Sequence, residues 1–172
     1  MSGSEFLVRS ATMDDASAIA EVHVASWQSA YRDILPAELL STLNVERRTE
    51  AWRRVLEGGP GSVLLATTTD QDVLGFCHVG PNRGAPTEFL GEVYAIYLLQ
   101  HARRRGVGRD LFTRATDVLR SRAHPSFLVW VLDVNLEARR FYERLGGRLV
   151  AEKSIEIASR PFREVAYGWL EP

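Results

Sequence analysis

Two glycines and four arginines fall together in residues 103–109, where a β-type run gives way to a helix-type run. The β-type run covers residues 93–99, and the helix-type run covers residues 107–119. A turn that ends at a helix N-terminus directs backbone N–H groups outward and so forms a site for an anion. The arginines add positive charge, and no acid follows before Asp110. The run therefore predicts a ligand that carries a diphosphate.

The spacing Arg103-x-x-Gly106-x-Gly108 does not fit two common phosphate-binding motifs. A P-loop needs a lysine and a hydroxyl residue directly after its last glycine, and neither is present here. A dinucleotide fingerprint needs three glycines and an acid about 20 residues further on, whereas this turn has two glycines. A solvated arginine-rich loop is the alternative that the turn alone leaves open.

A second motif lies downstream, in a stretch that indicates a strand, a turn, a short helix and a glycine stop. Residues 127–132 are apolar and rich in β-formers, and residues 136–145 fit a short helix that Gly146 ends. The stretch follows the pattern Asn-x-x-Ala-x-x-Phe-Tyr-x-x-x-Gly at Asn135, Ala138, Phe141, Tyr142 and Gly146. The two motifs, in this order, resemble those of the GCN5-related N-acetyltransferase (GNAT) superfamily.

The resemblance covers nearly the whole chain and implies a fold. That fold is of the α/β type, with a mixed sheet of six to seven strands that splays between its fourth and fifth strands and about four flanking helices. Residues 1–172 would form a single acetyltransferase domain, and 172 residues suit one domain with a core. Hydrophobic periodicity predicts strands at 6–9, 62–68, 73–79, 88–99, 127–132, 148–158 and 163–170, with the last two joined around Ser159-Arg160-Pro161.

Helical spacing predicts a first helix over residues 12–30, with Thr12 as its N-cap and Asp15 close to a capping box. Further helices are predicted from Pro36, over residues 45–56 and over residues 106–122. Together with the short helix of the second motif, these segments lie in the chain order that the resemblance implies.

The resemblance implies acetyl-CoA as the acyl donor, held without a metal. Backbone amides of the turn would hold the diphosphate, and an arginine would reach the 3′-phosphate. Glycine at 106 and 108 would let the backbone approach without a Cβ in the way. Gln100 stands where many members have proline, which changes the stiffness of the turn. The implied cofactor contacts are Ile96, Tyr97, Leu98, Arg103, Arg104, Arg105, Gly106, Val107, Gly108, Arg109, Asn135, Ala138 and Phe141.

The resemblance assigns two roles near the thioester, one to a backbone group and one to a side chain. The N–H of Leu98 would polarise the thioester carbonyl. Tyr142 is the candidate general acid, since a tyrosine has a pKa of about 10 and a thiol of about 8.5 in model peptides. A protonated tyrosine can therefore give its proton to the leaving thiolate. The alternative for Tyr142 is a ring that packs on the sheet with its hydroxyl satisfied.

Glu92 is the candidate general base. An alkylamine has a pKa of about 10.4, so at neutral pH it arrives charged and must lose a proton. Strand alternation puts Glu92 and Tyr94 on the face of Ile96 and Leu98. Some superfamily members carry a catalytic glutamate six residues before the carbonyl-donor position, where Glu92 falls. A carboxylate paired to an arginine and a relayed water are the alternatives, and Glu88 and Glu21 are weaker candidates.

The superfamily's acceptor cleft lies under the first two helices and their connection. Trp27 and Tyr31 stand four residues apart on the first of these helices, and with Tyr94 they are the candidate acceptor contacts. An aromatic pair at this spacing is more often part of the core, and we expect His23, on the same stripe, to be a packed histidine.

Composition excludes several other classes of protein. The net charge of −1 gives no broad field for nucleic acid or membrane, and no run approaches the about 20 apolar residues of a spanning helix. Arginine supplies every basic side chain of the Lys/Arg type except Lys153. The single Cys77 excludes an internal disulfide and, with no signal peptide in view, favours the cytoplasm. The remaining histidines, His78, His101 and His124, share no metal-ligand spacing.

The sequence thus predicts an N-acetyltransferase that transfers an acetyl group from acetyl-CoA to a primary amine of a small molecule or protein, directly in a ternary complex. A covalent acyl-Cys77 is the less expected route. A non-catalytic acyl-CoA-binding module is the alternative function, and an arginine-based nucleic-acid binder is less consistent with the net charge. The expected partners are acetyl-CoA and the amine, and a homodimer is a further expectation.

Overall fold

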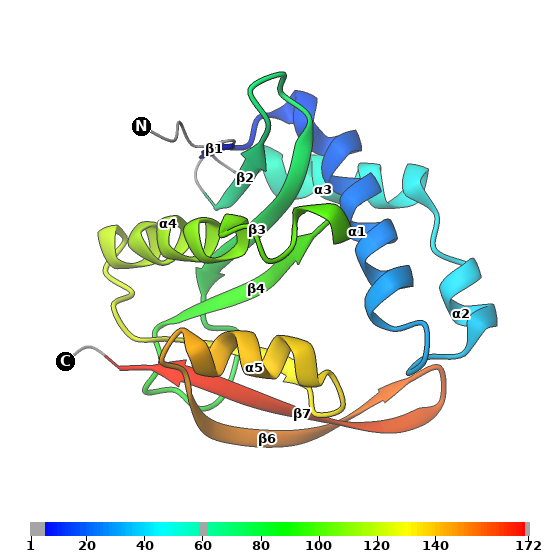
Figure 1. Ribbon diagram of the computed structural model, residues 1–172. Coiled ribbons are helices and arrows are strands. Elements are labelled where there is room, and N and C mark those ends of the chain that lie inside the picture. The colour runs from blue at the N-terminus through cyan, green and yellow to red at the C-terminus, as the bar shows by residue number, and fades with distance from the viewer. Residues whose placement is uncertain (1–5, 59–61, 171–172) are drawn as a thin grey trace. The chain divides into compact units, whose positions relative to one another are not determined.

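The computed structural model describes residues 6–58 and 62–170, and these residues form seven strands, five α-helices and two 3₁₀ turns (Figure 1). The strand order is β1-β2-β3-β4-β5-β7-β6. Pairing is parallel between β4 and β5 and antiparallel in the other described pairs. The mixed seven-stranded α/β sheet is confirmed, with five α-helices where about four were expected.

The strands are β1 (Leu7–Ser10), β2 (Val63–Thr67), β3 (Val73–Pro81), β4 (Gly91–Leu98), β5 (Phe127–Leu132), β6 (Arg148–Ile157) and β7 (Arg160–Trp169). The α-helices are α1 (Ala16–Ala30), α2 (Ala37–Ser41), α3 (Val45–Glu57), α4 (Val107–Ser121) and α5 (Leu136–Arg144).

The chain divides into two compact units. The first unit comprises Met1–His78 and Ala95–Val118, and the second comprises Val79–Tyr94 and Leu119–Pro172. β3, β4 and α4 each contribute residues to both units. The first unit holds the glycine-arginine turn, and the second holds the Asn-Phe-Tyr motif.

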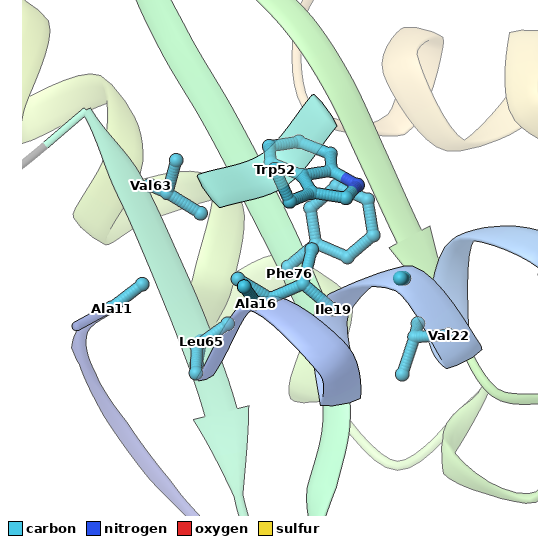
Figure 2. Close-up of a cluster of buried hydrophobic side chains, with 9 residues drawn as sticks. Ala11, Ala16, Ile19, Val22, Trp52, Val63, Leu65 and Phe76 are labelled. Atoms are coloured by element: carbon cyan, nitrogen blue, oxygen red, sulfur yellow. The ribbon is translucent and has the colours of Figure 1, made fainter. Parts of the chain in front are cut away.

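The first unit has a hydrophobic core between α1, α3 and the strands β2 and β3. Ile19 of α1 and Leu65 of β2 are fully buried, and Trp52 of α3 lies over Phe76 of β3 with the ring centroids 4.9 Å apart. Figure 2 shows these side chains converging from the two helices and the two strands. The apolar face of each helix therefore has a partner surface, which explains why these amphipathic segments form helices here.

The start of α1 follows the sequence signal with one difference. Thr12 and Asp15 form the expected capping box, in which the backbone N–H of Thr12 donates to the Asp15 carboxylate at 2.7 Å. The box closes the 3₁₀ turn Met13–Asp15, and α1 itself begins at Ala16. Arg9 adds a fork of two 2.8 Å bonds to Asp15, which fixes β1 against this turn.

The second unit is a strand layer under α5, as Figure 1 shows with α5 across β7. The rings of Tyr142 on α5 and Tyr167 on β7 have centroids 6.0 Å apart. The parallel ladder between β4 and β5 pairs residues 91–93 with 127–129 and ends at Val93 and Val129. The parallel pairing of β4 with β5 thus covers three residues of each strand.

Two predicted strand starts, those of β4 and β7, are each wrong by three residues. β4 begins at Gly91 instead of residue 88, because the stretch before it is held by loop bonds such as Leu90 N–H to the Ser126 carbonyl, at 3.0 Å. The β6–β7 turn is the pair Ala158 and Ser159, with φ values of 51° and 61°. Two central residues with positive φ match the twist of a tight hairpin, so Arg160 and Pro161 already belong to β7.

Candidate active site

The turn formed by residues 103–109, called the 103–109 turn, has the backbone geometry of an anion site. Arg104 and Gly106 have φ values of +59° and +84°, and successive residues that alternate between left- and right-handed conformations direct their N–H groups to one side. A Cβ built on Gly106 would meet nothing within 4 Å. The first bond into α4 runs from Asp110 N–H to the Gly106 carbonyl at 3.0 Å. The backbone N–H groups of residues 107–109 come before that bond. The first N–H groups of a helix have no acceptor within the helix, so they can donate to a ligand.

Side-chain burial fixes this turn in place and leaves its charge outside. Val107 is buried at the first position of α4, while Arg104, Arg105 and Arg109 are exposed. The helix start is therefore anchored by a buried side chain, with positive charge around it. An open cradle of amides with exposed guanidinium groups fits a diphosphate.

The C-terminal end of β4 is held from two sides within the first unit. Ser26 of α1 donates its hydroxyl to the Leu98 carbonyl at 3.2 Å. Gly75 of β3 lies so close that a Cβ there would be 2.7 Å from the Tyr97 carbonyl oxygen. Leu99 N–H bonds to the Leu74 carbonyl at 2.9 Å. The backbone around Leu98 is thus fixed, as a backbone donor must be, and its contact with the donor stays a prediction.

The side chain of Tyr97 points into the first unit's aromatic cluster. Its ring stacks on His23 at 5.2 Å between centroids and lies 5.8 Å from Phe76. Ala95 and Leu99 pack against the same core, so β4 alternates as predicted. Cofactor contacts of Tyr97 and of Ile96 stay predictions.

His23 is a packed histidine, as expected. Its Nδ1 accepts a 3.2 Å hydrogen bond from the Trp52 indole N–H. Burial, with a smaller contribution from the Arg48 charge, lowers the pKa of His23 to about 4, so the ring is neutral at pH 7. Trp27 and Tyr31 continue this row along α1 with their ring centroids 4.9 Å apart, and Tyr31 is buried. That packing agrees with the core alternative, and acceptor contacts of this pair stay a prediction.

The second motif forms a capped helix behind β5. The Asn135 side chain accepts the Ala138 N–H at 3.2 Å and so begins α5. Gly146 has a φ of +84°, and Gly147 N–H returns to the Tyr142 carbonyl at 3.0 Å. The capping roles explain the asparagine and the glycine of the motif without any ligand. Contacts of Asn135 and Ala138 with a cofactor stay predictions.

Tyr142 is buried on the inner face of α5, only 6% exposed. Its ring lies among Phe141, Tyr167 and Trp169, with centroids between 5.5 and 6.3 Å away. This packing holds the ring in one orientation, which both a general acid and a purely structural tyrosine require. Its role as the acid, and a cofactor contact of Phe141, stay predictions.

A polar network that sequence reasoning missed anchors α5 to β7. Arg139 donates to the Asp133 carbonyl and carboxylate and to the Tyr167 hydroxyl, the last at 3.0 Å. Tyr167 in turn donates to Glu143 at 2.6 Å. Arg163, through its hydrogen bonds, holds the pKa of Asp133 below its usual range. The i, i+4 spacing of Arg139 and Glu143 was the available signal, but it does not name the partner strand.

Glu92 is paired to an arginine. The Arg83 side chain donates to both carboxylate oxygens, at 2.7 Å from Nη2 and 3.3 Å from Nε, and the Arg83 backbone N–H donates at 3.0 Å. Glu92 is 4% exposed. The structure thus contains the ion pair that the sequence left as an alternative. A role as base requires Arg83 to move away, and it stays a prediction.

Glu92 and Arg83 line a cavity of about 670 Å³ within the second unit. We call it the Arg83 pocket, and its walls are Arg83, Gly84, Ala85, Pro86, Glu92, Trp130, Ala151, Glu152 and Lys153. Sequence reasoning singled out Glu92 alone as a site residue. The other wall residues carried no sequence signal, because strand pairing brings them together. Tyr94, a predicted acceptor contact, lies under the Arg83 guanidinium, 4.1 Å from its ring centroid.

Other chemistry has no support among the described residues. Cys77 is fully buried, which raises the pKa of its thiol and keeps it from acting as a nucleophile. Within residues 6–58 and 62–170, no cluster of three or more His, Cys, Asp or Glu could hold a metal ion. No helix in the same ranges has the length and apolar character to cross a membrane.

Comparison with known proteins agrees with this fold. Residues 23–147 match the model of the acetyltransferase (GNAT) family. The uncharacterized N-acetyltransferase YuaI of Bacillus subtilis (strain 168) is 37% identical over 94% of this chain and 91% of its own length. The chain therefore belongs to the acetyltransferase (GNAT) family.

Two solved structures share the fold at low sequence identity. One is the PaiA N-acetyltransferase from Thermoplasma acidophilum in complex with coenzyme A, with a TM-score of 0.72, 16% identity and coverage of 95% of this chain and 99% of that one. The other is YncA from Salmonella typhimurium with its cofactor acetyl-CoA, with a TM-score of 0.69, 19% identity and coverage of 95% and 92%. Both likenesses establish the fold alone.

Proposed function

We propose that this chain transfers the acetyl group of acetyl-CoA to a primary amine of a small molecule or protein, directly in a ternary complex. The observation that carries the proposal is the 103–109 turn, with its left-handed Arg104 and Gly106 and the amides that begin α4. Membership of the acetyltransferase family and the coenzyme A and acetyl-CoA complexes of PaiA and YncA support it. Acetyl-CoA supplies an acyl group that its thioester activates.

The chain's own groups supply binding, polarisation and a proton. The amides of residues 106–109 hold the diphosphate, and the Leu98 N–H orients the carbonyl. As the amine nitrogen bonds to the acyl carbon, the carbon–sulfur bond breaks, the nitrogen gives up a proton and the sulfur takes one. Tyr142 is the candidate donor of the proton to sulfur. The buried Cys77 makes direct transfer the better-supported route.

Removal of the amine proton has two candidate acceptors, a side chain and a water. Glu92 is the titratable candidate, but Arg83 occupies both of its carboxylate oxygens. A water relayed by backbone carbonyls is the competing proton acceptor. The pH dependence of kcat/KM for a Glu92→Gln variant distinguishes these two routes.

A thiol-release assay with acetyl-CoA and a panel of primary amines tests the proposal. We expect release that depends on the amine and saturates with acetyl-CoA. Binding of acetyl-CoA with no release across aminoglycosides, polyamines, amino acids and peptides would favour the alternative, a non-catalytic acyl-CoA-binding module. The single-domain organisation, the cytoplasmic location, a homodimer and independence of nucleic acid stay predictions.

A further inference from the structure

We infer that the Arg83 pocket binds a carboxylate of the acceptor, so that the substrates are primary amines that also carry a carboxylate. This inference rests on the proposed function, because it names the acceptor of that reaction. The pocket lies wholly within the second unit, and its volume of about 670 Å³ suits a small molecule. Its walls come from the 83–86 loop and from β4, β5 and β6.

Arg83 is oriented before any ligand arrives. One edge of its guanidinium bonds to Glu92, and its face lies 4.1 Å from the ring centroid of Tyr94. In the part of the chain that the structure describes, Nε and Nη2 are the side-chain donors of Arg83, which leaves its Nη1 group for a ligand. The arginine side chain is 65% exposed, whereas that of Glu92 is 6% exposed. A fixed guanidinium with an outward edge is the arrangement that binds a carboxylate through two parallel bonds.

Lys153 is a second oriented cation in the same pocket. Its ammonium lies 4.0 Å from the ring centroid of Trp130 and 3.5 Å from a carboxylate oxygen of Glu164. The aromatic face and the carboxylate restrict the otherwise flexible lysine, so less entropy is lost when a ligand binds. The Arg83 pocket is thus lined by two cationic side chains, Arg83 and Lys153, each restrained by an aromatic ring and a carboxylate.

An anion fits this pocket better than a cation. A cationic ligand would have to displace Arg83 from Glu92, or Lys153 from Trp130, and would leave a charge without its partner. A carboxylate can bind the exposed edge of Arg83 without displacing that arginine from Glu92. Glu152, the other acid in the wall, is exposed and lies 3.7 Å from Arg163, which also binds Asp133, so solvent and Arg163 together screen its charge.

The experiment compares matched acceptors. Amino acids from glycine to 6-aminohexanoate are assayed by thiol release against their primary amides, with kcat/KM corrected for the fraction of free amine. We expect the best amino acid to exceed its amide by about tenfold to a hundredfold, as for a hydrogen bond between charged groups. The Arg83→Gln and Lys153→Gln variants should each bring this ratio towards one. Arg53→Gln, which removes an exposed arginine paired to Glu50 in the first unit, should leave the ratio unchanged.

A binding measurement covers the case in which Arg83→Gln folds poorly. The same series of amino acids and their primary amides is titrated into the chain without acetyl-CoA, while the indole N–H resonance of Trp130 is followed. The resonance should move in the wild type and in Arg53→Gln, and move much less in Lys153→Gln, where only a half-exposed side chain is changed.

The outcomes separate the pocket from the reaction. A wild-type ratio near one, a preference for diamines over amino acids, or an unchanged ratio in both pocket variants would overturn the inference. If no acceptor releases thiol while the Trp130 resonance still responds to the carboxylate, the proposed function fails and the carboxylate pocket stands.

Discussion

The 103–109 turn and the Arg83 pocket are built in opposite ways. The turn is one continuous stretch, and its binding groups are backbone amides fixed by Gly106 and the start of α4. The walls of the pocket are side chains from a loop and three strands, and they include residues as far apart in sequence as Arg83, Trp130 and Lys153. A local pattern therefore encodes the first, whereas the second exists only after the strands have paired. Within one chain, the proposed donor site is therefore a local stretch, and the proposed acceptor site is assembled from a loop and three strands.

Substitution of Gly106 is expected to have the largest effect. Gly106→Glu places bulk and negative charge against the diphosphate and should weaken acetyl-CoA binding by ~10³-fold or more, the loss of about two charge-assisted hydrogen bonds. Gly106→Ala is the matched control, because it bears the same backbone cost at a φ of +84°, about 1 kcal/mol, without the charge. The thermal shift with acetyl-CoA measures both variants. An equal shift in wild type and Gly106→Glu would remove the turn from the donor site.

Tyr142→Phe is expected to have the next largest effect, now in the second unit. Loss of the acid should lower kcat by ~10²-fold with little change in acetyl-CoA affinity. Tyr167→Phe makes the same chemical change on a neighbouring ring whose hydroxyl bonds to Arg139 and Glu143, so it should cost about 1 kcal/mol of folding stability and little kcat. Similar steady-state kcat values for Tyr142→Phe and wild type would leave Tyr142 a packing residue.

Glu92→Gln tests whether the pocket also takes part in proton transfer. If Glu92 is the base, kcat/KM at pH 7 should fall by at least about tenfold, and the loss should shrink towards the amine pKa of about 10.4. Glu50→Gln, which changes an exposed glutamate paired to Arg53 in the first unit, is the control. A loss that stays constant across the pH–rate profile would mean that Glu92 acts by holding Arg83.

The smallest effect concerns the first unit's stability in acid. Burial lowers the pKa of His23 to about 4 in the folded chain, whereas a histidine in the unfolded chain has its ordinary pKa of 6.5. As the pH falls below 6.5, the unfolded chain therefore binds a proton that the folded chain does not. Stability is therefore lost progressively from about pH 6.5 to about pH 4, and about 1 kcal/mol of it is gone by pH 6. His23→Gln should flatten this part of the urea-unfolding curve against pH. An unchanged slope would mean that other groups cause the acid sensitivity.

Sequence-based prediction was accurate for features that a local pattern encodes and failed for contacts that depend on strand pairing. The capping box of Thr12 and Asp15 and the glycine stop at Gly146 are local signals, and they predicted structure correctly. The β6–β7 turn was misplaced because Pro161 suggests a turn, whereas the strand twist selects Ala158 and Ser159.

The partners of Glu92 could not be predicted for a physical reason. Arg83 follows β3 in a polar loop whose sequence contains no periodic pattern, and it reaches Glu92 because β4 returns beside that loop. Lys153 meets Trp130 only through the pairing of both β5 and β6 with β7. Such contacts depend on the register of three strands, which hydrophobic alternation alone does not define.

The separation of donor binding from chemistry is tested most directly by titrating acetyl-CoA into the wild-type chain and into Tyr142→Phe by calorimetry. We expect micromolar-range Kd values that agree within about twofold, although the two proteins differ in kcat by ~10²-fold. A Kd that rises in parallel with the loss of kcat, or the absence of binding heat in the wild type, would contradict the assignment of donor binding to the 103–109 turn and of proton transfer to α5.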